Sequence, residues 1–171
     1  CATLADLLAG GGYAGIIVNT VERAQGLARS LADAFGQGSV TLLHARFLAP
    51  DRASREKMLL QRLGGAKAPS LRQGLHIVVG TQVLEQSLDI DFDLLVTDLC
   101  PMDLLLQRIG RLHRHARQRP QKLAQAICLL LHAREDPLEE GAQAIYKAYP
   151  LLRARALLPE KLLLPRDIPR L

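Results

Sequence analysis

The segment Gln107-Arg108-Ile109-Gly110-Arg111-Leu112-His113-Arg114 places three arginines within eight residues, directly after a leucine-rich stretch. If a helix that turns about 100° per residue runs through it, four residues share one face: Gln107, Gly110, Arg111 and Arg114. Ile109 and Leu112 then form an apolar back, and Arg108 lies between the two faces. We predict a cationic front suited to phosphate, because guanidinium groups stay charged and donate two parallel N–H bonds. The alternative is a solvated helix end whose arginines only complement the helix dipole.

Around this segment, short apolar stretches alternate with amphipathic ones, which predicts an α/β protein with a mostly parallel sheet of five or six strands and helices on both faces. The predicted strands are 13–18, 40–43, 76–80, 94–97 and 126–131. The predicted helices are 3–8, 21–35, 52–63, 101–114, 138–149 and 151–157, with a short helical or turn segment at 82–88. Pro150 is expected to separate the last two helices.

The bulk composition fits one globular domain with a largely aliphatic core. The chain has 171 residues, of which 49% are hydrophobic and only 4% aromatic, and it contains no Trp. A net charge of +5 makes an anionic partner plausible without requiring one. The cysteines, Cys1, Cys100 and Cys128, have no CxxC spacing, so we interpret them as reduced thiols of a cytoplasmic protein. No apolar run is long enough to span a membrane. Because the chain begins at Cys1 and stops within a Pro-rich run, we expect it to be a fragment of a longer protein.

Polar residues follow several predicted strands, and the carboxyl ends of parallel strands are where α/β proteins place their functional groups. These residues are Asn19, Thr20, His44 to Arg46, Thr81 and Asp98. Purely structural interpretations remain open: Thr20 and Thr81 are good helix caps, and His44 would serve as a hydrogen-bonded histidine at a strand end. Asp91 and Asp93 are interpreted as solubility residues at a strand edge rather than ligands. The basic loop 114–122 is interpreted as solvated, with contact to DNA phosphates as the alternative.

Three motifs carry a resemblance to the second motor domain of superfamily 2 helicases, namely 16–21, 81–89 and 107–114. The wording of 43–47 (LHARF), 80–91 (GTQVLEQSLDID) and 103–115 (DLLLQRIGRLHRH) more closely resembles the CRISPR-associated helicase–nucleases of type I systems. The resemblance covers nearly the whole chain. It implies a RecA-like three-layer sandwich, with a domain core at 1–135 and a helical, Pro-rich extension at 136–171.

On the nucleotide side, the resemblance implies that Arg111 and Arg114 are arginine fingers that stabilise charge on a transferring phosphoryl group. Gln107 would face the same phosphate, and Asp89 would meet the ribose or metal side of the nucleotide. Arg108 and Gln86 complete the cofactor-binding set that the resemblance implies. The off-face angle of Arg108 suggests instead that it ties the helix to neighbouring carboxylates.

On the nucleic-acid side, the resemblance implies that the Thr81 hydroxyl contacts the strand backbone, a type of contact that positions a strand without reading its sequence. Weaker candidates for contacts with the same nucleic-acid strand are Gln82, His44, Arg46, Asn19 and Thr20. The histidines lack paired metal-ligand spacing, so no metal site is predicted.

Several motifs of a complete motor are missing from these 171 residues. There is no G-x-x-x-x-G-K-[ST] phosphate loop, no Asp-Glu-x-His stretch for Mg²⁺ and no His-Asp pair for a metal nuclease. We therefore expect ATP and Mg²⁺ to be held mainly by an N-terminal RecA-like lobe. The expected partners are that lobe, an HD nuclease domain, single-stranded DNA and a crRNA-guided surveillance complex. Two alternatives remain: the corresponding lobe of another superfamily 2 DNA or RNA helicase, and a nucleotide-independent scaffold that binds nucleic acid.

Overall fold

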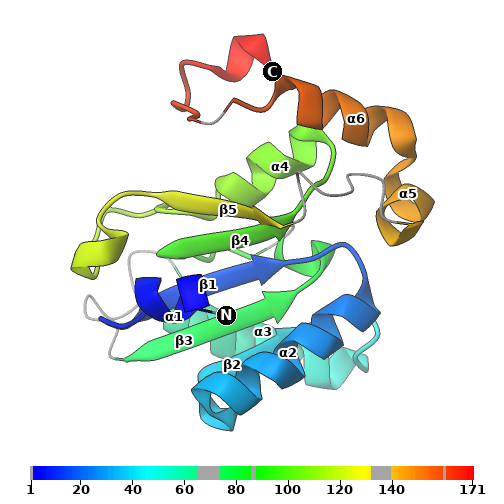
Figure 1. Ribbon diagram of the computed structural model, residues 1–171. Helices are drawn as coiled ribbons and strands as arrows, with labels where there is room; N and C mark the ends of the chain where they lie inside the picture. The colour runs from blue at the N-terminus through cyan, green and yellow to red at the C-terminus, as the bar shows by residue number, and fades with distance from the viewer. Residues whose placement is uncertain (1, 65–73, 86–87, 132–139, 160) are drawn as a thin grey trace.

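The computed structural model describes residues 2–64, 74–85, 88–131, 140–159 and 161–171. Its centre is a five-stranded sheet in the order β2-β3-β1-β4-β5, in which every pairing is parallel (Figure 1). The strands are β1 (Gly12–Ile17), β2 (Val40–Leu43), β3 (Leu75–Gly80), β4 (Leu94–Asp98) and β5 (Ile127–Leu131). The predicted α/β class and the predicted parallel sheet are confirmed.

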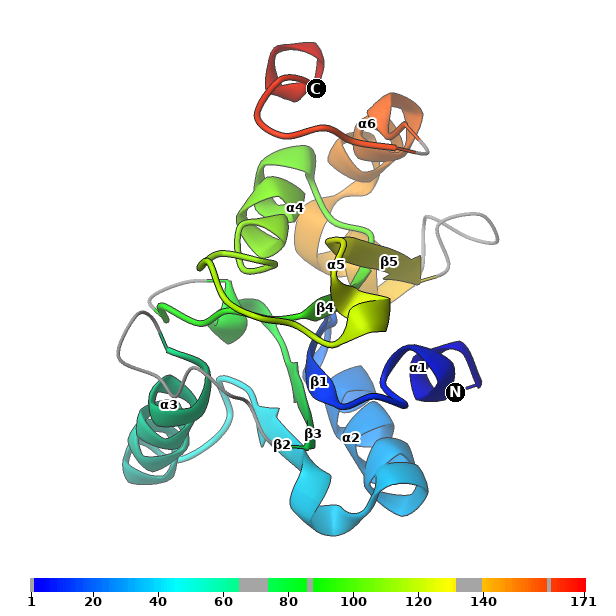
Figure 2. The ribbon, with the colours of Figure 1, turned by 90° about the vertical axis from the view of Figure 1, so that its left-hand side faces the viewer.

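Helices cover both faces of the sheet, as predicted. They are α1 (Ala2–Leu7), α2 (Val21–Phe35), α3 (Ala49–Leu63), α4 (Met102–Ile109), α5 (Glu140–Tyr146) and α6 (Ala148–Leu157). Figure 2 shows α1 and α2 on one side of the sheet and α3 and α4 on the other. Among the described residues, no helix is long and apolar enough to cross a membrane.

Alternation along the strands divides the core into two layers, because successive side chains of a strand point to opposite faces. In β3, Ile77 and Val79 pack in the layer under α1 and α2, whereas Val78 packs in the layer under α3. Leu94 and Leu95 of β4 divide in the same way. The three central strands β1, β3 and β4 are buried on both faces, which is why they appear in the sequence as continuous apolar runs, whereas the edge strands β2 and β5 are partly exposed.

A glycine in β1 allows an aromatic ring to pack directly against the strand. Phe92, which is fully buried just before β4, lies over Gly15, and a Cβ at Gly15 would come within 2.5 Å of the ring. The same Phe92 backbone binds the segment after α4: its N–H donates to Arg111 O at 2.8 Å, and its carbonyl accepts from His113 N at 3.0 Å. The arginine-bearing segment is thereby fixed against the sheet.

The predicted helix through Arg114 is therefore wrong, because α4 ends at Ile109. Gly110 is a poor helix former. After it, Arg111 N and Leu112 N make only the tighter bonds to the residue three positions back, and His113 N donates to Phe92 O instead. His113 adopts a left-handed backbone with φ 49°. Arg111 and Arg114 consequently do not share a helical face with Gln107, and any common site must come from tertiary packing.

The C-terminal helices also differ from prediction. The break lies at Lys147, whose φ is 65°, and not at Pro150. Pro150 lies in the first turn of α6, where the missing N–H would have no partner within the helix. The predicted domain boundary after residue 135 lies outside the described residues, so it stays a prediction.

Candidate functional site

Hydrogen bonds join the carboxyl ends of neighbouring strands into one polar edge, defined here as Asn19, Thr20, Thr81, Gln82 and Asp98. Asn19 N donates to Asp98 Oδ2 at 3.0 Å, and Gln82 Nε2 donates to Asn19 O at 3.1 Å. Most of the predicted nucleic-acid residues are thus brought together.

The two threonines of the polar edge differ in their bonding. Thr20 Oγ1 accepts a hydrogen bond from Arg23 N at 3.3 Å, so Thr20 caps α2 as its sequence position predicts. Thr81 precedes a single 3-10 turn, Gln82–Leu84, but its hydroxyl makes no capping bond. Thr81 is only 2% exposed, and Asn19 is buried as well, so Thr20 and Gln82 are the more accessible members of the edge.

His44 is hydrogen-bonded at the end of β2, in line with the structural alternative for this residue. Its Nε2 lies 3.3 Å from Gln25 Nε2, and its ring stacks on Phe47 at 4.2 Å between centroids. Burial lowers the pKa of His44, which therefore favours its neutral form. Arg46 is exposed on the adjacent turn, where it remains available to an anionic ligand.

His76, at the start of β3, is a buried neutral histidine. Arg62 Nη1 can only donate to its Nδ1 at 3.3 Å, so the Nε2–H donates to Thr41 Oγ1 at 3.0 Å. Burial lowers the pKa of His76 to about 4, and the Arg62 guanidinium adds to the shift.

This histidine predicts a pH-dependent stability. An unfolded histidine titrates near pH ~6.5, so between about pH 6.5 and about pH 4 the unfolded chain binds a proton that the folded chain does not, and stability falls as the pH falls. Urea unfolding from about pH 7 to about pH 5 is expected to show wild type losing about 2 kcal/mol more than His76→Gln. Parallel pH profiles of the two proteins would contradict this assignment.

Arg108 is the centre of a buried polar network behind the polar edge. The side chain is 0% exposed, and its Nε and Nη2 contact Glu85 Oε1 at 2.7 and 2.6 Å. Its other guanidinium bonds reach Thr97 Oγ1 (2.7 Å), Asp98 O (3.1 Å), Asn19 Oδ1 (3.2 Å) and Tyr146 OH (3.3 Å). The suggested tie to a carboxylate is thus present, and this burial leaves a nucleotide no access to Arg108 within this chain.

Sequence reasoning singled out neither Glu85 nor Tyr146. Glu85 lies within one of the quoted motifs, but nothing in its position showed that it would be buried against Arg108. Burial raises the pKa of the Glu85 carboxyl, and the Arg108 guanidinium opposes that shift.

A second group of site residues, which we call the arginine site, consists of Arg111, Arg114 and Asp89. Arg111 Nη1 and Nη2 donate to the carbonyls of Leu88 at 2.6 Å and Glu85 at 2.7 Å. Its Nε is buried without a hydrogen-bond partner among the described residues. Such an orphaned donor is uncommon in folded proteins and is consistent with a site that takes an anion or water.

Arg114 and Asp89 form the exposed part of the arginine site. Arg114 Nε donates to Asp89 Oδ1 at 2.7 Å, and their side chains are 42% and 52% exposed. Burial alone would raise the pKa of Asp89, but hydrogen bonds from Arg114 and His115 outweigh it and lower that pKa. Gln107 is exposed on α4, and Gln86 lies outside the described residues. The arginine site is formed by Asp89, in the segment before β4, and by two residues of the segment after α4. The polar edge lies at the carboxyl ends of the strands.

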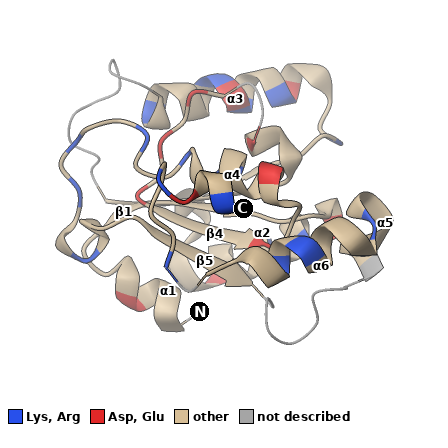
Figure 3. Ribbon diagram, turned by 90° about the horizontal axis from the view of Figure 1, so that it is seen from above, with Lys and Arg blue, Asp and Glu red and all other residues tan. Residues whose placement is uncertain are grey.

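Two expectations about charged residues are wrong. Asp91 and Asp93 are buried. Arg117 and Arg119, in the loop expected to be solvated, pair with them, and their side chains are only 7% and 5% exposed. Arg117 Nε lies 2.6 Å from Asp91 Oδ2, and Asp93 Oδ2 accepts from Tyr13 N at 2.7 Å. Mutual pairing permits this burial, and it anchors the loop to the sheet. In Figure 3, basic and acidic positions lie close together around α4.

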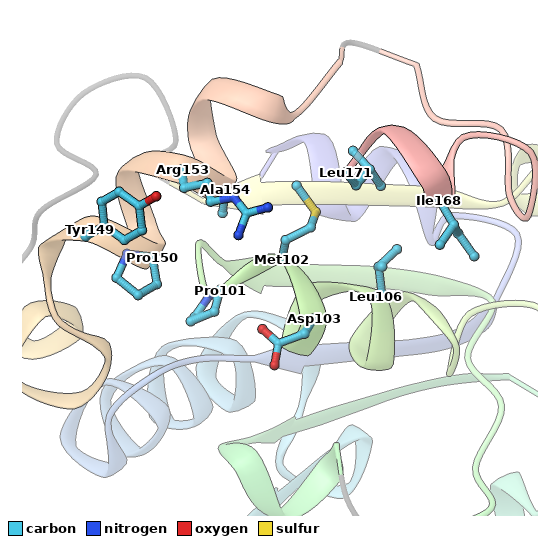
Figure 4. Close-up of a pocket in the computed structure, with 10 residues that line it drawn as sticks. All are labelled: Pro101, Met102, Asp103, Leu106, Tyr149, Pro150, Arg153, Ala154, Ile168 and Leu171. Atoms are coloured by element: carbon cyan, nitrogen blue, oxygen red, sulfur yellow. The ribbon is translucent and has the colours of Figure 1, made fainter.

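A mainly apolar pocket of about 370 Å³ lies apart from both groups. Met102 and Leu106 of α4, Ala154 of α6 and Ile168 near the C-terminus contribute to its walls (Figure 4). None of the predicted site residues lines it. Within the described part of the chain, no cluster of three or more His, Cys, Asp or Glu is placed to hold a metal ion.

The parallel sheet with helices on both faces is a RecA-like α/β fold. It is shared with the C-terminal domain of the DEAD-box protein Dbp5, at 18% identity and a TM-score of 0.53, a likeness that shows the fold alone. Residues 10–117, more than half of the chain, match the family model described as the C-terminal part of the CRISPR-associated nuclease/helicase Cas3. The chain belongs to this family.

Curated relatives and solved structures agree with this assignment. The chain is 52% identical over 159 residues to a CRISPR-associated nuclease/helicase Cas3 of Streptococcus thermophilus. This alignment covers 92% of the chain and 17% of that relative. It is 48% identical over 137 residues to a Thermus thermophilus Cas3, covering 75% of the chain and 14% of the relative. The T. fusca Cas3-ATP crystal structure matches 98% of the chain and 21% of its own length, at 31% identity and a TM-score of 0.83. The chain therefore spans less than a fifth of these curated relatives' length.

Proposed function

We propose that this chain is the C-terminal motor lobe of an ATP-dependent translocase that moves on single-stranded DNA and unwinds invader DNA in CRISPR antiviral defence. The observation that carries the proposal is the separation of two sites in one RecA-like lobe. The arginine site has one exposed guanidinium, that of Arg114, and the polar edge lies elsewhere, at the carboxyl ends of the strands. A motor needs both, because it must hold a nucleotide and a strand at the same time.

For the nucleotide, Arg114 has the side chain best placed to act as an arginine finger. It is exposed, and its partner Asp89 is exposed too, so the pair can separate at little cost in a solvated setting. Arg111 donates to the carbonyls of Glu85 and Leu88. Its buried Nε has no hydrogen-bond partner among the described residues and would offer one further donor once the nucleotide uncovers it. Solved relatives include Cas3 structures named for their ATP, ADP and AMPPNP complexes.

ATP would supply the transferable phosphoryl group, held mainly by an N-terminal lobe with Mg²⁺. This chain's part would be electrostatic: preorganised guanidinium groups placed where negative charge develops lower the barrier without reorganising. Asp89 would keep Arg114 in position until the nucleotide arrives, and would then be free to meet its ribose or metal side.

For nucleic acid, the accessible side chains at the carboxyl end of the sheet are Thr20, Gln82 and Arg46. We propose that Thr20 and Arg46 donate to the phosphate backbone of a single DNA strand, and that the Gln82 amide oxygen accepts from N–H groups of its bases. Asn19, Thr81 and His44 would support these residues from beneath. The phosphate contacts would grip a strand of any sequence, as a translocase requires. One solved relative is titled a CRISPR RNA-guided surveillance complex, which supports an equivalent partner for the full protein here, in addition to its other motor lobe and a nuclease domain.

This division of labour predicts that the 171-residue chain alone does not hydrolyse ATP or cut DNA. Release of phosphate from Mg-ATP, with and without single-stranded DNA, is expected to stay at the level of a protein-free control. The reason is that the chain contributes fingers but no phosphate loop. Metal-dependent ATPase activity of the chain that disappears in Arg111→Ala would overturn the proposal.

A further inference from the structure

We propose that Tyr146 is a positioning residue that couples the polar edge to the arginine site. The proposal rests on the function proposed above and adds a residue of the C-terminal helices to it. Tyr146 ends α5, and its hydroxyl contacts two residues that lie 64 and 38 positions earlier in the chain, Gln82 and Arg108.

The Tyr146 oxygen accepts both of these hydrogen bonds. Gln82 Nε2 lies 2.9 Å from it and Arg108 Nη2 lies 3.3 Å from it, and both nitrogens can only donate. One phenolic oxygen therefore joins a side chain of the polar edge to the buried guanidinium of α4. A phenylalanine would keep the ring and its packing but would lose both bonds.

The bond to Asn19 fixes which end of the Gln82 amide faces the protein, and the bond to Tyr146 holds it there. Asn19 O only accepts, so the amide nitrogen of Gln82 must face it, at 3.1 Å. The same nitrogen donates its second hydrogen to Tyr146. With both donors used on the protein, the amide oxygen of Gln82 faces the opposite side. Tyr146 thereby helps to hold Gln82 with its amide oxygen toward a ligand.

From Arg108, the contacts continue to the arginine site through Glu85. The Glu85 carboxylate binds Arg108, and the Glu85 backbone carbonyl accepts from Arg111 Nη2 at 2.7 Å. Gln82 is also the first residue of the 3-10 turn Gln82–Leu84, and Glu85 follows that turn directly. A shift of Gln82 on binding a strand would therefore be felt at Arg111 both through this turn and through Tyr146.

The test uses the full-length protein and measures ATP hydrolysis as a function of oligo(dT) concentration. Tyr146→Phe is expected to raise the oligo(dT) concentration for half-maximal stimulation about tenfold, the effect of losing one or two net hydrogen bonds. Tyr149→Phe is the matched control, since the same hydroxyl is removed from a tyrosine three residues away that is 75% exposed. It should behave as wild type.

A double-mutant cycle distinguishes positioning from general destabilisation. If Tyr146 acts through Gln82, combining Tyr146→Phe with Gln82→Ala should change half-maximal stimulation at least about threefold less than the product of the two single effects. Multiplicative effects, or a Tyr146→Phe curve that coincides with wild type, would overturn the inference. The proposed function is tested separately by Arg114→Ala. If that variant keeps its ATPase activity, the proposed function is wrong. If it loses the activity and Tyr146→Phe behaves as wild type, only the inference about Tyr146 is wrong.

Discussion

Arg114→Ala in the full-length protein is expected to lower the rate of DNA-stimulated ATP hydrolysis by about a thousandfold, the lower range for loss of an arginine finger. Affinity for single-stranded DNA should change little, because Arg114 belongs to the arginine site and not to the polar edge. Steady-state phosphate release and fluorescence binding to a labelled oligonucleotide measure the two quantities in the same preparation.

Arg52→Ala is the matched control for this variant. Arg52 is 46% exposed and paired with a carboxylate, Glu56, much as Arg114 is 42% exposed and paired with Asp89. The two substitutions remove the same charge from similar settings. A decrease in the ATPase rate that is confined to Arg114→Ala would therefore reflect the position of Arg114 in the arginine site. ATPase within about threefold of wild type would remove Arg114 from the catalytic assignment, since a finger accounts for far more.

Arg108→Met is expected to destabilise the 171-residue chain by about 3–5 kcal/mol, the usual cost of breaking a buried ion pair from one side. Methionine can fill the apolar part of the space, but it leaves Glu85 as an uncompensated buried carboxylate. It also removes donors from Thr97 and Asn19. Urea unfolding followed by circular dichroism measures the loss.

Two further variants separate charge from geometry at this position. Arg108→Lys should restore only part of the stability, because an ammonium group cannot reproduce the planar set of donors that reaches Glu85, Thr97 and Asn19. Arg108→Met combined with Glu85→Leu should be more stable than Arg108→Met alone, because no buried charge remains unpaired. Stability of Arg108→Met within about 1 kcal/mol of wild type would show that the buried network contributes little.

The elements that could be predicted from the sequence are those whose cause is local. Continuous apolar runs identified all five strands, and Thr20 identified the start of α2. The end of α4 could not be predicted, because it depends on the pairing of Arg111 and His113 with Phe92, about twenty residues earlier in the chain.

The sequence predicted which residues form the candidate site better than it predicted how they are arranged in space. The quoted motifs contain Arg111, Arg114 and Asp89, which do meet in space, but through tertiary contacts and not along a helical face. The burial of Asp91 with Arg117 was missed, since nothing in the sequence shows which of 22 basic side chains will pair with a given carboxylate. Tyr146 lies in a stretch that resembles the family, but no role was predicted for it, because its partners Gln82 and Arg108 lie 64 and 38 positions earlier in the chain.

The most direct test of the proposed motor lobe is a structure of the full-length protein bound to a non-hydrolysable ATP analogue and single-stranded DNA. The distance from the Arg114 guanidinium to the nearest γ-phosphate oxygen is expected to be about 3 Å, within hydrogen-bonding range. The strand backbone is expected at Thr20, and a base of the strand at Gln82. If Arg114 instead stays on Asp89 while the nucleotide is bound and the strand lies elsewhere, the account is contradicted.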